Sequence, residues 1–182
     1  GRLCEATGFE VVDVDLLPVH GGSMRVFIRA IHPENRPSPA VTEMLAAEKA
    51  AGMTDRNAFK AFADRVQRIR EDLVGMIASL KAQGKVIAGY GAPAKGNTLL
   101  NYFGIGPGHL EYLVDRNTLK QGLYSPGMKI AVVSPDEIAL RRPDYLLVLA
   151  WNFFDEIREQ LADYERAGGK FIVPLPHPHI VP

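Results

Sequence analysis

The sequence contains a single cysteine, Cys4, among its 182 residues. One cysteine excludes an internal disulfide and any zinc site built from cysteines of this chain, and we expect a cytoplasmic protein. The chain also has no net charge at pH 7, because 21 Lys and Arg residues balance 21 Asp and Glu residues. No global field draws the chain to nucleic acid or to an anionic membrane, so we expect neither as a partner.

Long hydrophobic runs are absent as well. The longest apolar stretches, such as residues 145–151, are far shorter than the roughly 20 residues that a bilayer span needs, and no signal segment opens the chain. A hydrophobic content of 47% with 23% charged residues excludes disorder and is typical of a globular protein. Because the chain starts at Gly1 and residues 2–9 resemble the end of a helix, we expect a fragment of a longer protein.

The N-terminal part predicts a pair of antiparallel strands. Two runs rich in β-branched residues, 11–17 and 24–31, flank the turn residues His20, Gly21 and Gly22. The proline-rich stretch that follows favours a linker. We therefore predict a division into residues 1–32, a linker at 33–39 and a second domain at 40–182.

The second domain begins with a long amphipathic helix and continues as alternating strands and helices. Apolar residues recur at three- and four-residue steps from Phe59 to Leu80, and Gly84 ends this helix. Short apolar strands at 85–90, 110–114, 129–133, 144–150 and 170–174 alternate with helices at 97–103, 135–140 and 154–167. This order predicts an α/β fold: a Rossmann-like, doubly wound, mostly parallel sheet, preceded by the long helix and the antiparallel strand pair.

A glycine-rich turn lies between the first strand and first helix of the predicted sheet. Ligands of open parallel sheets bind at the carboxyl ends of strands, where glycines allow close approach and helix amides attract anions. The spacing departs from both the dinucleotide fingerprint and the P-loop. A tight turn whose glycines serve packing alone remains an alternative. The candidate ligand residues of this turn are Gly89, Tyr90, Gly91, Ala92, Lys95, Gly96 and Asn97.

Further candidates follow later strands and the N-terminal turn. Asp115 ends the second strand, where an acidic residue would bind a ribose hydroxyl or cap a turn. Trp151 and Asn152 follow the strand at 144–150 and are expected at the same edge. His20 could face a substrate cleft or serve only the turn. No third ligand accompanies the histidines at 177 and 179, so we predict no metal site.

These motifs carry a resemblance to a known family. The chain is similar to the C-terminal region of the S-adenosylmethionine-dependent sugar C-methyltransferases, that is, to the C-methyltransferase C-terminal domain. Nearly the whole chain takes part in the resemblance, and residues 89–102 are its most specific segment. The other matching segments are 19–25, 115–117 with 120–122, 143–145, and 151–152.

The resemblance implies a methyltransferase that works on a nucleotide-linked keto sugar. Members of the family have a zinc-binding module, a middle domain that binds S-adenosylmethionine, and a Rossmann-like C-terminal domain. Residues 1–32 would be the last strands of the middle domain. The methyl donor would then be a cofactor of the parent enzyme, with none bound by this fragment, which would be inactive alone and contain no catalytic residue beyond the cleft candidate His20. Expected partners are the nucleotide-sugar, the rest of the methyltransferase chain and, as a further candidate, a second copy of this chain.

Two other functions remain open at this point. One is a nucleotide- or dinucleotide-binding module with no role in methyl transfer. The other is a purely structural domain whose Rossmann-like site is empty.

Overall fold

The computed structural model describes residues 1–182, apart from the side chain of His20. The chain forms two compact units, residues 1–64 and residues 65–182, and each is described by itself. Among the described residues, no helix combines the length and the apolar character needed to cross a membrane.

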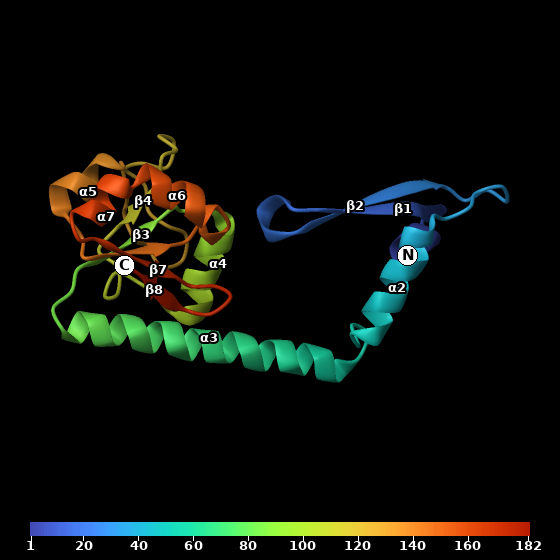
Figure 1. Ribbon diagram of the computed structural model, residues 1–182, viewed down its shortest axis with the longest axis horizontal. Coiled ribbons are helices and arrows are strands. Elements are labelled where there is room, and N and C mark those ends of the chain that lie inside the picture. Colours follow the sequence, from blue (N-terminus) through green and yellow to red (C-terminus); the bar gives the residue numbers. More distant parts are fainter. The chain divides into compact units, whose positions relative to one another are not determined.

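The first unit is built on a two-stranded antiparallel ribbon, as the sequence predicted (Figure 1). Helix α1 (Arg2–Ala6) precedes strand β1 (Phe9–Leu17), and a short 3-10 helix, η1 (Val19–Gly21), leads into strand β2 (Ser23–Ala30). The pairing places Val11 opposite Ile28 and Val14 opposite Val26, with an irregularity between Val11 and Asp13. Such a bulge bends a strand and increases its twist.

The segment after the ribbon returns to β1. The Ser38 amide donates to the Val12 carbonyl at 2.8 Å, and the Ser38 hydroxyl donates to the Asp13 carboxylate. Helix α2 (Pro39–Ala50) then packs against β1, with a proline in its first turn where the missing amide costs no hydrogen bond. The two units meet at residues 64 and 65, and residues 33–39 lie within the first unit. A functional boundary at 33–39 stays a prediction.

The long helix α3 (Arg56–Ala82) is confirmed, and its residues from Arg65 onward belong to the second unit. The second unit contains a mostly parallel sheet with the strand order β5-β4-β3-β6-β7-β8. The order reverses between β3 and β6, as in doubly wound nucleotide-binding folds, so the predicted fold class is confirmed. The strands are β3 (Ile87–Tyr90), β4 (Leu113–Val114), β5 (Val132–Val133), β6 (Tyr145–Val148), β7 (Lys170–Val173) and β8 (His179–Val181).

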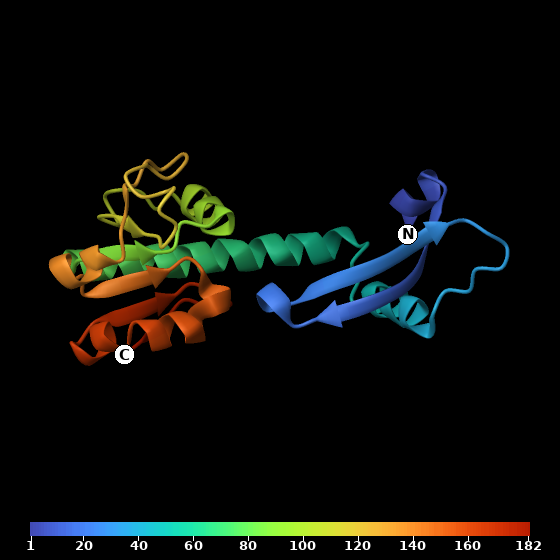
Figure 2. The ribbon, with the colours of Figure 1, turned by 90° about the horizontal axis from the view of Figure 1, so that it is seen from above.

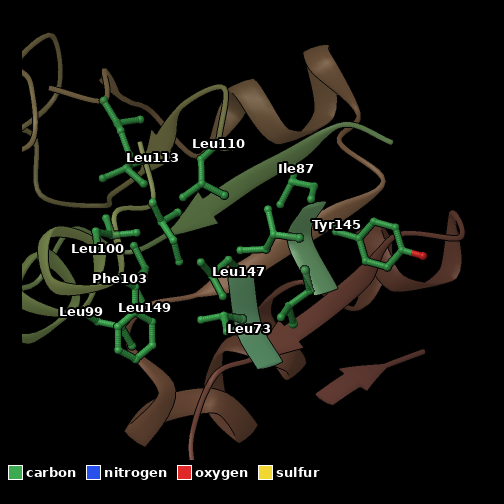
Figure 3. Close-up of a cluster of buried hydrophobic side chains, with 14 of the residues drawn as sticks. Leu73, Ile87, Leu99, Leu100, Phe103, Leu110, Leu113, Tyr145, Leu147 and Leu149 are labelled. Carbon is green, nitrogen blue, oxygen red and sulfur yellow. The ribbon is translucent and has the colours of Figure 1, made fainter. Parts of the chain in front are cut away.

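Helices cover both faces of this sheet, and strand side chains alternate between two hydrophobic cores (Figures 1 and 2). Figure 3 shows one core, where Leu73 of α3 and Leu99 of α4 converge on Leu147 of β6. The opposite core contains Phe171 of β7. The remaining helices are α4 (Ala94–Phe103), α5 (Asp136–Arg141), the 3-10 helix η2 (Trp151–Phe153), α6 (Phe154–Gln160) and α7 (Ala162–Arg166).

Two details differ from the sequence prediction. The expected single helix at 154–167 is interrupted at Leu161, which leaves helical geometry with φ −105° and ψ 23°. The break lets Leu161 and Tyr164 both reach the core around Phe171, where the Tyr164 and Phe171 ring centroids lie 5.5 Å apart. The C-terminal tail, for which the sequence predicted no strand, adds β8 antiparallel to β7.

We predict opposite effects for two helical Gly-to-Ala substitutions. A Cβ at Gly96 would lie 2.9 Å from the Leu149 Cβ, so Gly96→Ala forces α4 away from β6 and should lower the free energy of unfolding by about 1–3 kcal/mol. Gly75 on α3 has open space around its missing Cβ, and Gly75→Ala should raise stability by about 0.5–1 kcal/mol. Urea unfolding measures both values. Equal effects of the two substitutions would contradict close packing at Gly96.

Candidate functional site

A crevice with a volume of about 350 Å³ opens at the carboxyl edge of the sheet. It lies where β3, β4 and β6 end, next to the reversal of strand order, which is where open α/β sheets bind ligands. Three residues predicted from sequence line it together: Tyr90, Gly91 and Asp115. The other lining residues are Pro93, Val114, Arg116, Ala150, Phe153, Glu156, Ile157 and Gln160.

Gly89 in β3, Gly91 in the following turn and Gly96 in α4 have different surroundings. Gly91 has φ +88°, a left-handed conformation that side chains rarely adopt, and its position lines the crevice. Gly89 faces inward instead, because a Cβ there would lie 2.5 Å from Leu113 Cδ2. Gly96 likewise packs against Leu149. Gly89 and Gly96 are therefore both needed for close packing around the turn. The packing interpretation therefore describes these two glycines, whereas Gly91 lines the crevice and its role toward a ligand stays a prediction.

Asp115 locks the turn to the loop after β4. Its Oδ2 accepts from the Ala92 amide at 2.8 Å and from Lys120 Nζ at 3.0 Å, and its Oδ1 accepts from the Asn117 amide at 2.8 Å. Lys120 Nζ also donates to the Ala92 carbonyl at 3.0 Å. Burial alone would raise the pKa of Asp115, but the hydrogen bonds from Asn117, Ala92 and Lys120 outweigh it and hold the pKa below its usual value. Asp115 was predicted to bind a ribose hydroxyl. Both of its carboxylate oxygens thus already accept hydrogen bonds within the protein.

A chain of polar side chains forms one wall of the crevice. Arg116 Nη1 donates to Gln160 Oε1 at 3.0 Å, and Gln160 Nε2 donates to Glu156 Oε1 at 2.8 Å. Tyr90, only 7% exposed, lies among these charges. Burial raises the pKa of the Tyr90 hydroxyl; Arg116 lowers it, and Asp115 and Glu156 raise it further. The crevice therefore contains both hydrogen-bond donors and acceptors.

Lys95 lies next to the crevice. Its Nζ is 4.7 Å from the centroid of the Trp151 ring and 5.9 Å from that of Phe153, and Phe153 lines the crevice. Cation–π contacts of this kind hold an ammonium group in place while leaving its N–H donors available. Desolvation lowers the pKa of Lys95. The first turn of α4 thus places one cation near Phe153, at the border of the crevice.

The remaining predicted residues are dispersed. Ala92 is buried and its amide is bound by Asp115. Asn97 lies on α4, and its Oδ1 is buried without a hydrogen-bond partner among the described residues. Asn152 is half-buried within η2. The side chain of His20, at the turn of the ribbon, lies outside the described residues.

Sequence reasoning missed Phe153, Glu156 and Gln160, and it included Arg116 only within the matching segment 115–117. A signal was present, because α6 follows β6 after only the short η2 and so starts near the carboxyl edge. Glu156 and Gln160 are four residues apart and share one helix face. On an amphipathic helix, however, such a pair is indistinguishable from an ordinary solvated face.

The fold and the crevice define a doubly wound α/β domain with a ligand-sized site at its topological switch point. A family model described as the C-methyltransferase C-terminal domain matches residues 18–176. The chain belongs to this family, which confirms the resemblance seen in its motifs.

A curated relative agrees with this assignment. The chain is 41% identical over 184 residues to the C-methyltransferase NovU of Streptomyces niveus. The alignment covers 100% of this chain and 44% of that protein, so the chain spans less than half the length of this relative.

We predict that Asp115→Asn destabilises the second unit by about 1–3 kcal/mol at neutral pH, because one acceptor oxygen is replaced by a donor that faces the Ala92 amide or Lys120. Since the folded-state pKa of Asp115 is depressed, its contribution is present above the unfolded pKa and is lost as pH falls through the folded pKa. Unfolding measured between pH 7 and pH 2 should therefore show a smaller acid-induced loss in the variant. The exposed Asp72→Asn serves as the matched control. If both variants unfold like the wild type, Asp115 does not lock the turn.

Proposed function

We propose that this chain is the C-terminal part of an S-adenosylmethionine-dependent C-methyltransferase and that it helps to hold a nucleotide-linked keto sugar. The observation that carries the proposal is the crevice at the switch point of a domain of this family, with Lys95 beside it. A nucleotide-sugar combines an uncharged nucleoside and sugar with an anionic diphosphate. The donors and acceptors of the crevice suit the uncharged groups, and the Lys95 ammonium suits the phosphates.

The chemistry assigned to the parent enzyme is methyl transfer to a ring carbon. A base would remove the proton from the carbon next to the ketone, and that carbon would take up the methyl group. S-adenosylmethionine, bound by the rest of the methyltransferase chain, would supply this sulfonium methyl group and leave as S-adenosylhomocysteine. The role of this chain is to bind and orient the acceptor, because proximity and alignment of two bound molecules dominate such a step. By itself the chain is expected to transfer no methyl group.

The ribbon of the first unit supports its assignment to the methyltransferase domain. Apolar side chains remain strongly exposed on it: Leu16 is 72% exposed, and Met24 and Ile28 are each 50% exposed. Exposed apolar surface on an isolated strand pair favours burial against further structure. In this proposal, residues 1–32 are the last strands of that domain, and the rest of the methyltransferase chain covers them.

A structural role is the second candidate. The tight packing at Gly89 and Gly96 and the engagement of Asp115 within the protein favour a turn that serves stability alone. In that case the domain would support the parent enzyme while its crevice stayed empty.

Calorimetric titration of the chain with dTDP, S-adenosylmethionine and NAD, each in turn, tests the proposal. We expect heat of binding with dTDP alone. Binding of NAD without dTDP would identify a dinucleotide module instead. If all three give no signal with the chain and dTDP gives none with the full-length protein, the structural role is favoured.

We predict that Lys95→Ala in the full-length enzyme weakens dTDP binding roughly tenfold, because a charge-assisted hydrogen bond to phosphate is lost. Lys60→Ala, an exposed lysine of α3, should leave the affinity unchanged. Calorimetry gives both dissociation constants. Unchanged affinity and methylation rate in the Lys95 variant would remove this residue from the site.

A further inference from the structure

We propose that the crevice takes the nucleoside of the ligand, with Glu156 accepting a hydroxyl of its sugar, and that Asp115 is a lock that contacts no ligand. This inference rests on the proposed function and assigns its parts. It places the nucleoside and the phosphates at separate groups of residues.

The size of the crevice limits what can enter it. Its volume of about 350 Å³ is near the lower end of the roughly 300–1,000 Å³ found for small-molecule sites. A complete nucleotide-sugar would need far more enclosed space, so only one part of it is held here. The Phe153 side chain, which is 44% exposed, offers apolar surface to a planar base.

The charged groups that line the crevice favour the uncharged nucleoside of the ligand over its phosphates. Asp115 is paired with Lys120 at 3.0 Å and Arg116 is bound to Gln160, whereas the Glu156 carboxylate has no cation within hydrogen-bond distance among the described residues. A diphosphate placed against the crevice wall would meet this carboxylate and be repelled by it. A nucleoside carries hydroxyls that donate to carboxylates and meets no such repulsion.

Glu156 and Asp115 differ in the capacity that remains for a ligand. Asp115 accepts three hydrogen bonds from Ala92, Asn117 and Lys120. Glu156 accepts one, at Oε1 from Gln160, among the described residues. Its second oxygen is therefore the acceptor available to a sugar hydroxyl on the crevice wall. Doubly wound folds commonly place this acceptor at the end of the second strand, the position of Asp115, and here it is moved to α6.

The phosphates lie outside the crevice in this arrangement. Lys95 is held over Trp151 and reaches Phe153, whose ring also lines the crevice. A ligand with its nucleoside in the crevice would leave past Phe153 and bring its first charged group to the Lys95 ammonium. The geometry thus orders nucleoside, phosphate and sugar along one path.

The test uses the full-length protein and three probes: thymidine, inorganic pyrophosphate and dTDP. We expect Glu156→Gln to weaken thymidine roughly tenfold and to leave pyrophosphate unchanged. Glutamine at this position still accepts from Gln160, so the polar wall is preserved. Lys95→Gln should do the reverse, weakening pyrophosphate roughly tenfold with thymidine unchanged. Glu159→Gln, an exposed site on the same helix that does not line the crevice, is the matched control.

Each other outcome overturns a defined part of the argument. If dTDP binds and thymidine does not, or if Glu156→Gln binds thymidine like the wild type, the nucleoside assignment is wrong while the proposed function stands. If pyrophosphate binding responds to Glu156→Gln, the crevice holds phosphate. If neither dTDP nor thymidine binds the wild type, both proposals fail. Thermal unfolding of each variant shows that the effects come from folded protein.

Discussion

One carboxylate, that of the half-buried Asp115, ties together two segments at the carboxyl edge of the sheet. Asp115 binds the Ala92 amide from the turn after β3 and the Asn117 amide and Lys120 ammonium from the loop after β4. These two segments have little regular structure, and their polar groups would otherwise need water or other partners. These hydrogen bonds also fix the walls of the crevice, because the bonded residues adjoin Tyr90, Gly91 and Arg116. Asp115, which the sequence suggested as a ligand residue, thus shapes the crevice in which we propose that a ligand binds.

Close packing sets the second constraint. Gly96 allows α4 to approach β6 so closely that Leu149 occupies the space a Cβ would take. Lys95 precedes Gly96 on the same helical turn, and Trp151 follows β6 by a few residues. The contact between the Lys95 ammonium and the Trp151 ring at 4.7 Å is therefore a consequence of how α4 lies on the sheet. Gly96 therefore contributes both to the stability of the domain and to the position of Lys95.

The architecture was largely predictable because its signals are local. Parallel strands buried on both faces appear as apolar runs, and the alternation with helices defines the doubly wound order. The break at Leu161 was not predictable, since the apolar spacing continues through it to Tyr164. Strand β8 was missed because its pairing with β7 depends on contacts across the tail and not on the composition of His179–Val181.

The site was less predictable than the fold, and the reason is chemical. Residue type and strand-end position identified Tyr90, Gly91 and Asp115 as residues of one edge, and the structure brings them to one crevice. The same information assigned Gly89 and Gly96 to a ligand, although both are needed for packing. Whether a glycine faces a ligand or a leucine depends on three-dimensional packing that spacing does not encode. Glu156 and Gln160 show the converse case, because a polar helix face reveals a binding wall only once the opposite strand ends are in place.

The charged groups at the carboxyl edge of the sheet are distributed unevenly. The Asp115 and Glu156 carboxylates and the Arg116 guanidinium line the open crevice, and Lys120 is paired with Asp115 at 3.0 Å. The Lys95 ammonium lies against Trp151 and Phe153 and is not among the lining groups. In the arrangement that we propose, a ligand with one neutral and one anionic end is favoured in one orientation, because reversing it would place phosphate against the Glu156 carboxylate. Under the proposed function, in which one carbon of the acceptor is presented to a methyl donor, fixing the direction of the ligand matters as much as its affinity. The crevice and Lys95 would in this way help to determine which atom of the acceptor reacts.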